Sequence, residues 1–354
     1  MRLLDLLLDK KQVKLTEEQY HLLLWINHKK IDNNFKERWN KKVGNVDNHI
    51  KFFIKKDLIQ PPPIDVTLNK LYTVAELKSI LERKNIKVKG RKSDLINAAI
   101  ENSSPSELKK LTSKYKVYEL TSQGKKVLNE LEEKQKQKEH LIEMECIAAL
   151  LDKTPKKAIE FIYKKYPDTE IFSLMSDGSV GLSQHTNDYI ITKEVELILK
   201  LDFKDSNIPY SKHKKISAAI ALYHVLGISI YDMTIKVQEI INMPFYCDDL
   251  FEFTRNNSTY MTNDIHQSIK NGDTINDFDL LNIYIHTKLF LAINKVNLEY
   301  LTKYRTGLGI KINCADDCPI CKAQKRFYKW NEIHTVPKLP IHWGCRCIYT
   351  SWIN

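Results

Sequence analysis

The feature that most constrains this chain is a concentration of metal-binding side chains near its C-terminus. Of the seven cysteines among the 354 residues, four lie between positions 318 and 347, and His342 lies close to the last two. These five candidate ligands are Cys318, Cys321, His342, Cys345 and Cys347. A Cys-x2-Cys pair turns both sulfurs toward one ion, and the His-x2-Cys-x-Cys group can complete a tetrahedral set. The sequence therefore predicts one structural zinc that holds this segment together.

The cysteine cluster leaves some choices open. Cys345 and Cys347 are one residue apart, and in an extended segment they point the same way, so either can reach the metal. Cys314, just upstream, is the spare thiol. A packed free-thiol or partly disulfide-linked cluster is an alternative, and a Cys/His nucleophile or an open zinc site is a third. Because no acid, base and substrate pocket are evident nearby, we expect a structural role and no enzyme activity.

The N-terminal part of the chain carries nearly all of the net positive charge. Residues 1–143 contain 30 lysines and arginines against 20 acidic residues, whereas the remainder contains 25 against 24. The formal net charge of the whole chain is +11. A local positive field favours a polyanion, either nucleic acid or an anionic membrane surface, although a lysine-rich surface that only aids solubility has the same composition.

No membrane-spanning segment is expected. In the N-terminal "MRLLDLLLDKK", Asp5 and Asp9 interrupt the apolar run, so this stretch does not resemble a secretory signal. The most apolar stretch, residues 216–231, is shorter than the roughly 20 residues that a spanning helix needs. We predict a buried helix over 211–226, with His224 as a hydrogen-bonded core residue rather than a ligand. A cytosolic, reducing location follows, where clustered cysteines more often bind metal than form disulfides.

The chain is predicted to be mainly α-helical and to contain several domains. Helices are expected after Thr16, which fits a capping box with Gln19, and in the segment before Pro61. A short strand at 117–120 and a helix from Ser122 complete an N-terminal region of residues 1–63 and 113–131. This region is compatible with a winged-helix-like unit interrupted by an insertion at 64–112. A plain helical domain with one short strand is the alternative.

The rest of the chain is predicted as a linker, a helical body and a small C-terminal motif. Residues 132–143 are charged and lack an apolar stripe, which indicates an exposed connecting helix or linker. Residues 144–306 form the body, with a loop and a hairpin expected at 173–188. Residues 307–354 contain the Cys/His motif. The best helix candidates in the body are 144–152, 155–165, 211–226, 231–242 and 278–304.

The insertion has the pattern of two short helices joined by a basic loop. Thr73 and Glu76 form a capping box at a helix start, and the apolar residues that follow lie on one helical face. The loop "NIKVKG" ends at Gly90, which suits a turn with positive φ. A second helix begins directly after it. A core of about 35 residues is smaller than most independent domains, so we expect this helix pair to pack on its neighbours.

Residues 71–102 resemble the SAP domain, a helix-loop-helix module of DNA-binding proteins. The matching segments are Thr73–Leu77, Ile86 and Val88, Gly90–Lys92 and Asp94–Ile96. The resemblance implies binding of double-stranded DNA through the loop and the start of the second helix, with Gly90 letting the backbone approach. The contacting cations would be Lys87, Lys89, Arg91 and Lys92. No set of residues here reads base edges, so weak, salt-sensitive affinity is expected. A module that holds a protein partner is the alternative.

The order of motifs at the C-terminus resembles the head-morphogenesis family of tailed phages, the minor head proteins. The helix "LFLAINKVNLEYLTKY" precedes the cysteine pair, and a proline-containing stretch leads to the terminal His-x2-Cys-Arg-Cys. Residues 314–348 fit this order, although "KAQKRFYKW" lacks the acidic residue and glycine that often follow the second cysteine. The resemblance implies a protein near the portal of a phage capsid, acting in assembly or DNA delivery, with no established reaction.

These observations predict a DNA-binding protein of phage or prophage origin that acts in capsid assembly or DNA packaging and delivery. Its expected partners are double-stranded DNA and portal or other capsid proteins, in the bacterial cytoplasm or the virion. The alternative is a regulatory or maintenance protein of a mobile element whose Cys/His motif is only structural. An enzyme, such as a nuclease in residues 144–306, is disfavoured because no acidic metal-binding motif or histidine-containing nuclease signature stands out.

Overall fold

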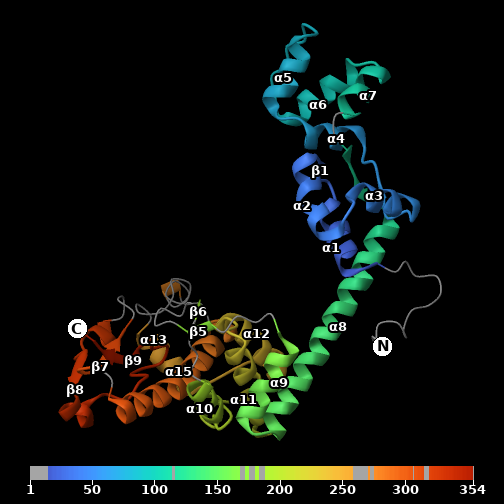
Figure 1. The fold of residues 1–354 in the computed structure, drawn as a ribbon. Helices are drawn as coiled ribbons and strands as arrows, with labels where there is room; N and C mark the ends of the chain where they lie inside the picture. Colours follow the sequence, from blue (N-terminus) through green and yellow to red (C-terminus); the bar gives the residue numbers. More distant parts are fainter. Residues whose placement is uncertain are drawn as a thin grey trace. The chain divides into compact units, whose positions relative to one another are not determined.

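The computed structural model describes most of the chain. The described residues are 15–113, 116–167, 172–174, 180–182, 188–257, 270–271, 275–305, 307–314 and 319–353. The chain is mainly helical, with a few small sheets, as the sequence predicts (Figure 1). It divides into two compact units, Met1–Glu139 and His140–Asn354. Helix α8, Ser122–Asp152, contributes residues to both units.

The N-terminal region has the element order of a winged helix. Its helices are α1 (Glu17–Ile26), α2 (Asn33–Val43) and α3 (Val46–Lys55). Its strands are β1 (Lys30–Ile31), β2 (Ile59–Gln60), β3 (Lys116–Val117) and β4 (Glu119–Leu120). Strand β1 pairs antiparallel with β3, and β2 pairs antiparallel with β4. The order is helix, strand, helix, helix and strand, followed after the insertion by the two short strands β3 and β4. The insertion therefore lies between β2 and β3, where a winged helix has its wing.

One hydrophobic core joins the two sequence segments that flank the insertion. Leu22, Leu23 and Ile26 of α1 contribute to it from one segment, and Val127 and Leu128 of α8 contribute from the other. The α1 start carries the predicted capping box, because Thr16 Oγ1 accepts from the Gln19 backbone N–H and Gln19 Oε1 accepts from the Thr16 N–H. These two segments therefore fold together around residues 64–112.

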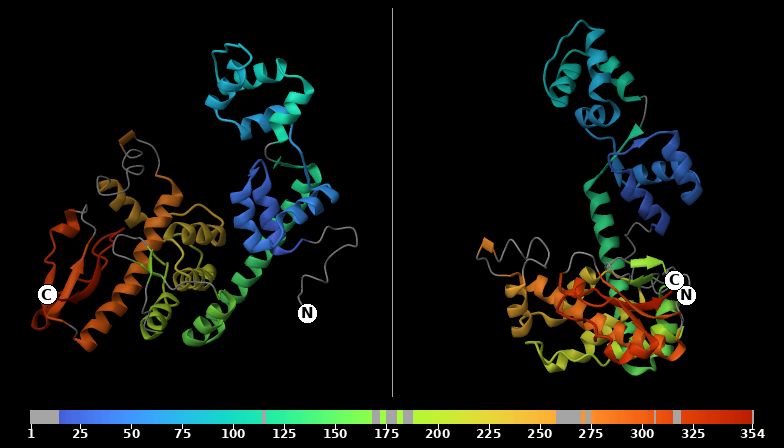
Figure 2. Two further views of the ribbon diagram at one scale, coloured as in Figure 1. Left: turned by 45° about the horizontal axis from the view of Figure 1, so that its top comes forward. Right: turned by 90° about the vertical axis from the view of Figure 1, so that its left-hand side faces the viewer.

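The inserted residues form a helical module with a core of its own. It comprises α4 (Ile64–Leu71), α5 (Val74–Glu82), α6 (Lys92–Glu101) and α7 (Pro105–Ser113). Leu77 and Leu81 of α5 pack on Leu95 and Ile96 of α6, and Leu68 of α4 joins them. The α5–α6 pair thus packs on neighbouring helices, as its small size led us to expect. Figure 2 shows this module from two further sides.

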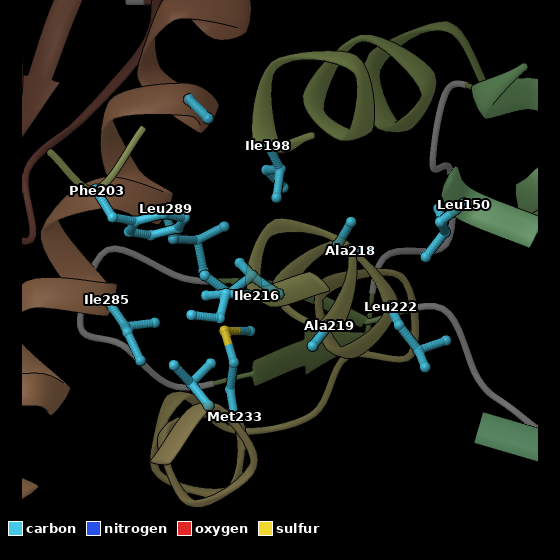
Figure 3. Close-up of a cluster of buried hydrophobic side chains, with 14 of the residues drawn as sticks. Leu150, Ile198, Phe203, Ile216, Ala218, Ala219, Leu222, Met233, Ile285 and Leu289 are labelled. Carbon is cyan, nitrogen blue, oxygen red and sulfur yellow. The ribbon is translucent and has the colours of Figure 1, made fainter. Parts of the chain in front are cut away.

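The second unit is built on a large helical core. Its helices after α8 are α9 (Pro155–Lys165), α10 (Asp188–Ile198), α11 (Tyr210–Val225), α12 (Ile230–Ile241), α13 (Asp248–Asn256) and α15 (Asp277–Tyr304). Side chains such as Ile216, Met233 and Leu289 meet in its centre (Figure 3). From Ile216 to Leu222 every residue of α11 is buried, which explains why this part of the helix is almost entirely apolar.

Several predictions for the body can be compared directly with the structure. His224 is 8% exposed, and its Nε2 lies 2.8 Å from Glu194 Oε2, so it is the hydrogen-bonded core histidine that was predicted. Strands β5 (Phe172–Leu174) and β6 (Val180–Leu182) pair antiparallel within the stretch predicted as a loop with a hairpin. Residues 132–143 are helical and lie within α8. Among the described residues, no helix has both the length and the apolar content needed to cross a bilayer.

The C-terminal segment contains a three-stranded antiparallel sheet that the sequence analysis did not predict. Its strands are β7 (Gly309–Asn313), β8 (Phe327–Lys329) and β9 (Ile348–Trp352), in the order β8-β7-β9. Ile310 and Ile312 of β7 are buried with Leu301 from the end of α15. Cys321, Cys345 and Cys347 belong to the same core. A hydrophobic core therefore stabilises this segment together with any metal that it binds.

Candidate nucleic-acid interface and metal centre

The loop before α6 is shaped by a side chain that caps the helix. Asp94 Oδ2 accepts a hydrogen bond from the Arg91 backbone N–H at 2.7 Å. Gly90 has a φ of +155°, and a Cβ at this position would lie 2.3 Å from the same Asp94 oxygen. A side chain at position 90 would therefore require the Asp94 carboxylate to leave its capping position. The approach of the Gly90 backbone to DNA, which the SAP resemblance implies, stays a prediction.

The four predicted DNA-contacting cations differ in their surroundings. Lys87, Lys89 and Arg91 are exposed on or beside the loop. Lys92 is half-buried, and its Nζ donates to the Asn69 carbonyl at 2.5 Å, which ties α6 to α4. The structure therefore presents three of these cations to solvent and gives the fourth a contact within the module. Phosphate oxygens are the groups that such exposed cations bind on a duplex.

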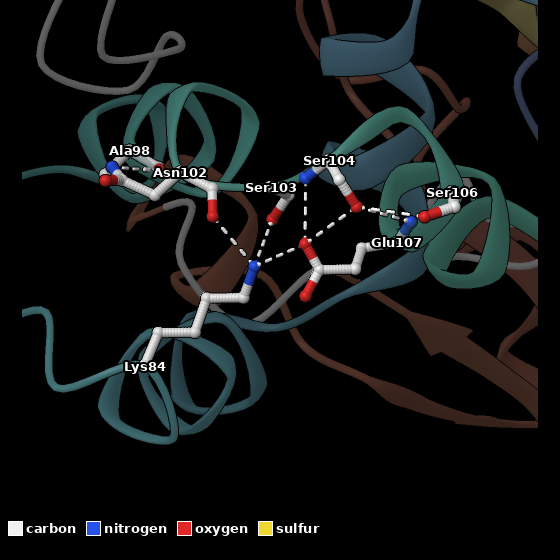
Figure 4. Close-up of polar contacts among 7 residues, drawn as sticks. All are labelled: Lys84, Ala98, Asn102, Ser103, Ser104, Ser106 and Glu107. Atoms are coloured by element: carbon white, nitrogen blue, oxygen red, sulfur yellow. Dashed lines mark hydrogen bonds and ion pairs between the residues drawn. The ribbon is translucent and has the colours of Figure 1, made fainter.

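Lys84 holds the module together at the end of α5. Its Nζ donates to the Asn102 carbonyl at 2.8 Å, to Ser103 Oγ at 3.0 Å and to Glu107 Oε2 at 3.0 Å (Figure 4). Hydrogen bonds from the Ser104 backbone and from Lys84 lower the pKa of Glu107 to about 2. Because these contacts link α5, α6 and α7, Lys84 has a structural role and is not part of the exposed basic loop.

The Cys/His centre is assembled from the loops around the C-terminal sheet. Cys314 follows β7, and Cys321 lies on the short helix α16 (Pro319–Lys322). His342, Cys345 and Cys347 precede β9. Cys318, a predicted ligand, lies outside the described residues. The remaining predicted ligands meet in space although the chain separates them by about twenty positions.

Two sets of three donor atoms share the Cys321 sulfur. In one set Cys321 Sγ lies 3.1 Å from His342 Nε2 and 3.7 Å from Cys345 Sγ. In the other set, Cys314, Cys321 and Cys347 have their sulfurs within 4.8 Å of one another. A Zn–S bond of about 2.3 Å in a tetrahedron places two sulfurs about 3.8 Å apart. The Cys321–Cys345 separation therefore fits two thiolates on one ion, and this group of residues can hold a metal.

A tight turn brings His342 and Cys345 to the same side of the centre. The Cys345 N–H donates to the His342 carbonyl at 3.1 Å, which closes a β-turn. Gly344 in this turn has a φ of +72°, a conformation that favours glycine. The HWGC sequence is therefore the local reason that an imidazole and a thiol three residues apart face the same point.

The His342 ring is oriented by contacts on its far side. Its Nδ1 lies 2.7 Å from the Trp343 carbonyl, so that Nδ1 carries the proton and Nε2 is left with a lone pair toward Cys321. The ring also stacks on Phe253 of α13 at a centroid distance of 5.6 Å. A hydrogen bond of this kind behind the ligating nitrogen is the usual arrangement in histidine metal sites.

Helix α15 fixes the backbone that carries the ligands. Asn294, which is fully buried, donates from Nδ2 to the Cys347 carbonyl at 2.9 Å and accepts from the Tyr349 N–H at 3.2 Å. Thr287 Oγ1 accepts from the Gly344 N–H at 2.9 Å. Two polar residues seven positions apart on one helical face thus hold the turn and the start of β9.

The thiols influence one another's protonation. Hydrogen bonding from neighbouring thiols, above all Cys321, holds the pKa of Cys345 far below its ordinary value. Hydrogen bonds with Cys321 and Cys345, together with burial, raise the pKa of Cys347. One thiolate is therefore stabilised within the cluster. Metal ligation needs thiolates, so this arrangement suits a cation.

The structure adds Cys314 to the candidate metal ligands. Cys314, treated as the spare thiol, lies with Cys321 and Cys347. Cys345 and Cys347 were both expected to be able to approach the metal, and both have their sulfurs within 4.8 Å of the Cys321 sulfur. Only the position of Cys314 one residue after a strand could have indicated its role.

The comparisons with known proteins agree with one part of this description. Residues 70–102 match the family model of the SAP domain, which suggests DNA binding. No curated protein and no solved structure gives a significant match to the chain. The resemblance of residues 314–348 to the phage head-morphogenesis family has no support in these comparisons and stays a prediction from the sequence.

Proposed function

We propose that this protein binds double-stranded DNA through the basic loop of its SAP module. The observation that carries the proposal is the match of residues 70–102 to the SAP domain together with the exposure of Lys87, Lys89 and Arg91. These cations contact phosphates, so binding depends little on sequence and weakens as salt rises. The role is binding rather than catalysis.

Replacing Lys89 and Arg91 by alanine tests this proposal. Each lost phosphate contact lowers the slope of log affinity against log salt by about 0.9, so the double variant is expected to flatten it by about 2. The measurement is fluorescence anisotropy of the full chain on a labelled duplex across a salt series. The control is Lys214→Ala with Lys215→Ala, two exposed lysines of α11 in the other unit, which removes the same charge.

The result that contradicts the SAP proposal is a salt slope equal to that of the wild-type chain. Such a result would favour the alternative in which the module holds a protein partner. Lys92→Ala is a poor test, because it also removes the hydrogen bond to Asn69 and so disturbs the packing of α6 on α4.

We propose further that the Cys/His centre binds one zinc ion with a structural role. Support comes from the 3.7 Å sulfur separation and from the imidazole whose Nε2 faces Cys321. Nitrogen and sulfur donors suit zinc better than calcium or magnesium, which prefer oxygen. Bound there, zinc would cross-link α16 to the segment before β9. Cys321, His342 and Cys345 would hold it, and Cys347, Cys314 and Cys318 are the available further thiols.

A role in phage head morphogenesis is the biological setting that we propose for these two activities. It is supported by the motif order of residues 314–348, in which a long helix leads to the cysteine pair and then to His-x2-Cys-Arg-Cys. A minor head protein is expected to be encoded beside portal and scaffold genes and to remain in purified virions. Mass spectrometry of virions induced from the host checks this. Absence from virions, with a gene among regulators, would favour a regulatory or maintenance role in a mobile element.

A further inference from the structure

Helices α2 and α3 form a helix-turn-helix pair with a well-defined turn. The Gly44 N–H donates to the Asn40 carbonyl at 3.0 Å, and Gly44 has a φ of +79°. The Asn40 side chain then accepts from the Val46 N–H at 3.0 Å, which caps the start of α3. The two helices and the β1–β3 and β2–β4 pairs complete the winged-helix order. The second helix of such a pair is the one that enters the major groove of DNA.

One face of α3 packs on the core and the opposite face is polar. Val46, Ile50 and Phe53 are buried. Asn48, Lys51 and Lys55, spaced i, i+3 and i+7, are exposed on the other side of the helix. The first of these lies in the first turn of α3, the part of a recognition helix that reaches base edges.

The exposed face of α3 has an uncompensated positive charge. No ion pair or hydrogen bond of the Lys51 or Lys55 ammonium is found among the described residues. Asp47 is the single acidic residue of α3, and it is paired with Lys36 of α2 at 2.8 Å. Arg38 of α2, by contrast, lies over the Trp25 ring at 5.7 Å. The cations that have these local partners are on α2, and the two α3 lysines are available to bind a polyanion.

We infer that this face of α3, formed by Asn48, Lys51 and Lys55, is a second DNA-contacting surface that supplies base readout. Asparagine makes a bidentate contact with adenine in the major groove, and lysine binds guanine or phosphate. The SAP loop has cations for phosphates and no set of residues that reads bases. The SAP loop would therefore position the chain on the duplex, and the α3 face would recognise the base sequence. The inference rests on the proposed function for its partner, a DNA duplex, and adds a separate surface.

Two linked surfaces on one duplex bind more tightly than either alone, because the second contact is intramolecular. The SAP module is inserted between β2 and β3, and these strands belong to the same unit as α3. A chain that uses both surfaces is expected to show a steeper salt dependence than the SAP loop alone provides. It is also expected to show a sequence preference that the SAP loop alone does not provide.

The first arm of the test measures the electrostatic contribution of α3. The full chain is titrated with a labelled duplex of random sequence over a salt series. Replacing Lys51 and Lys55 together by alanine is expected to reduce the magnitude of the slope of log affinity against log salt by about 2. The Lys214→Ala, Lys215→Ala control should leave it unchanged. Both α3 lysines are exposed, so far-ultraviolet circular dichroism and thermal unfolding should match the wild type.

The second arm measures sequence preference. The wild-type chain is used to enrich a randomised duplex pool, and Asn48→Ala is expected to lose that enrichment while its affinity for random DNA changes by about twofold or less. An unchanged salt slope for the lysine variant, or unchanged enrichment for Asn48→Ala, overturns the inference. A protein partner that is lost with the lysine variant while DNA binding persists also overturns it.

The two DNA proposals fail separately. If Lys89→Ala with Arg91→Ala weakens binding and the α3 variants do not, the SAP proposal stands and the α3 surface is wrong. If the wild-type chain does not bind duplex DNA in the salt series, both are wrong. The pattern of losses across these variants therefore identifies which surface contacts DNA.

Discussion

Replacement of Cys321 by serine is expected to remove the bound metal and to loosen the C-terminal sheet. Cys321 is the donor common to both sets of candidate ligands, so its loss leaves neither set complete. The free energy of binding a structural zinc is part of the free energy of folding, because the unfolded segment has no preformed site. The measurement is the zinc content per chain of protein purified under reducing conditions, with hydrogen exchange across residues 307–353.

Cys247→Ser is the matched control for this experiment. Cys247 is a buried cysteine in the helical core of the same unit and is not part of either donor set. It should keep its metal even if the unit loses some stability. Cys314→Ser removes one member of a single set, so a smaller effect than that of Cys321→Ser is expected. A metal-free wild-type chain with a protected C-terminal segment would leave the packed-thiol alternative in place.

The elements that the sequence predicted best are those whose signals are local. The helix expected at 278–304 is observed as Asp277–Tyr304, and that expected at 155–165 has the same bounds in the structure. Apolar residues at helical spacing and capping residues are close in sequence, so they can be recognised without knowledge of the fold. The SAP module belongs to this group, because its capping box at Thr73 and Glu76 is also local.

The elements that escaped prediction depend on contacts between distant residues. Helix α2 buries Trp39 and little else, so it has no apolar stripe to reveal it. Strand β7 pairs with β9 across an intervening stretch that includes most of the Cys/His segment, with Ile310 opposite Ser351. A strand of five residues gives a weak signal, and its partner cannot be found from spacing alone. Residues outside the Cys/His segment, such as Leu301 and Ile310, therefore help to form its core.

The candidate metal centre was predictable in composition and not in geometry. Residue types and spacing pointed to Cys321, His342 and Cys345, which the structure brings together. The position of Cys314 could not be deduced, because it depends on β7 pairing with both of its neighbours. The positive φ of Gly90 was predicted from the sequence, whereas its closeness to the Asp94 carboxylate is visible only in three dimensions.

Gly124→Ala is expected to destabilise the winged-helix region strongly. A Cβ on Gly124 would lie 2.0 Å from the Leu58 carbonyl oxygen and 2.9 Å from its carbon, which are backbone atoms that cannot turn away. Two hydrogen bonds of Thr121 hold Gly124 close to Leu58. The Thr121 N–H donates to the Leu58 carbonyl at 3.1 Å, and Thr121 Oγ1 accepts from the Gly124 N–H at 2.9 Å. Overpacking of this kind typically costs about 1–3 kcal/mol.

The contact between Gly124 and Leu58 joins the chain segments before and after the SAP insertion, so its loss should destabilise both segments. Hydrogen exchange is expected to accelerate in peptides from residues 15–60 and 116–131 of the variant, and to stay unchanged in α11 and α15. Gln123→Ala, at the exposed neighbouring position of α8, should change stability by less than about 0.5 kcal/mol. Wild-type protection in Gly124→Ala would mean that α8 and the β2 segment do not meet as described. Since the α3 surface depends on this packing, Gly124→Ala should also weaken sequence-selective DNA binding, while Gln123→Ala should leave it intact.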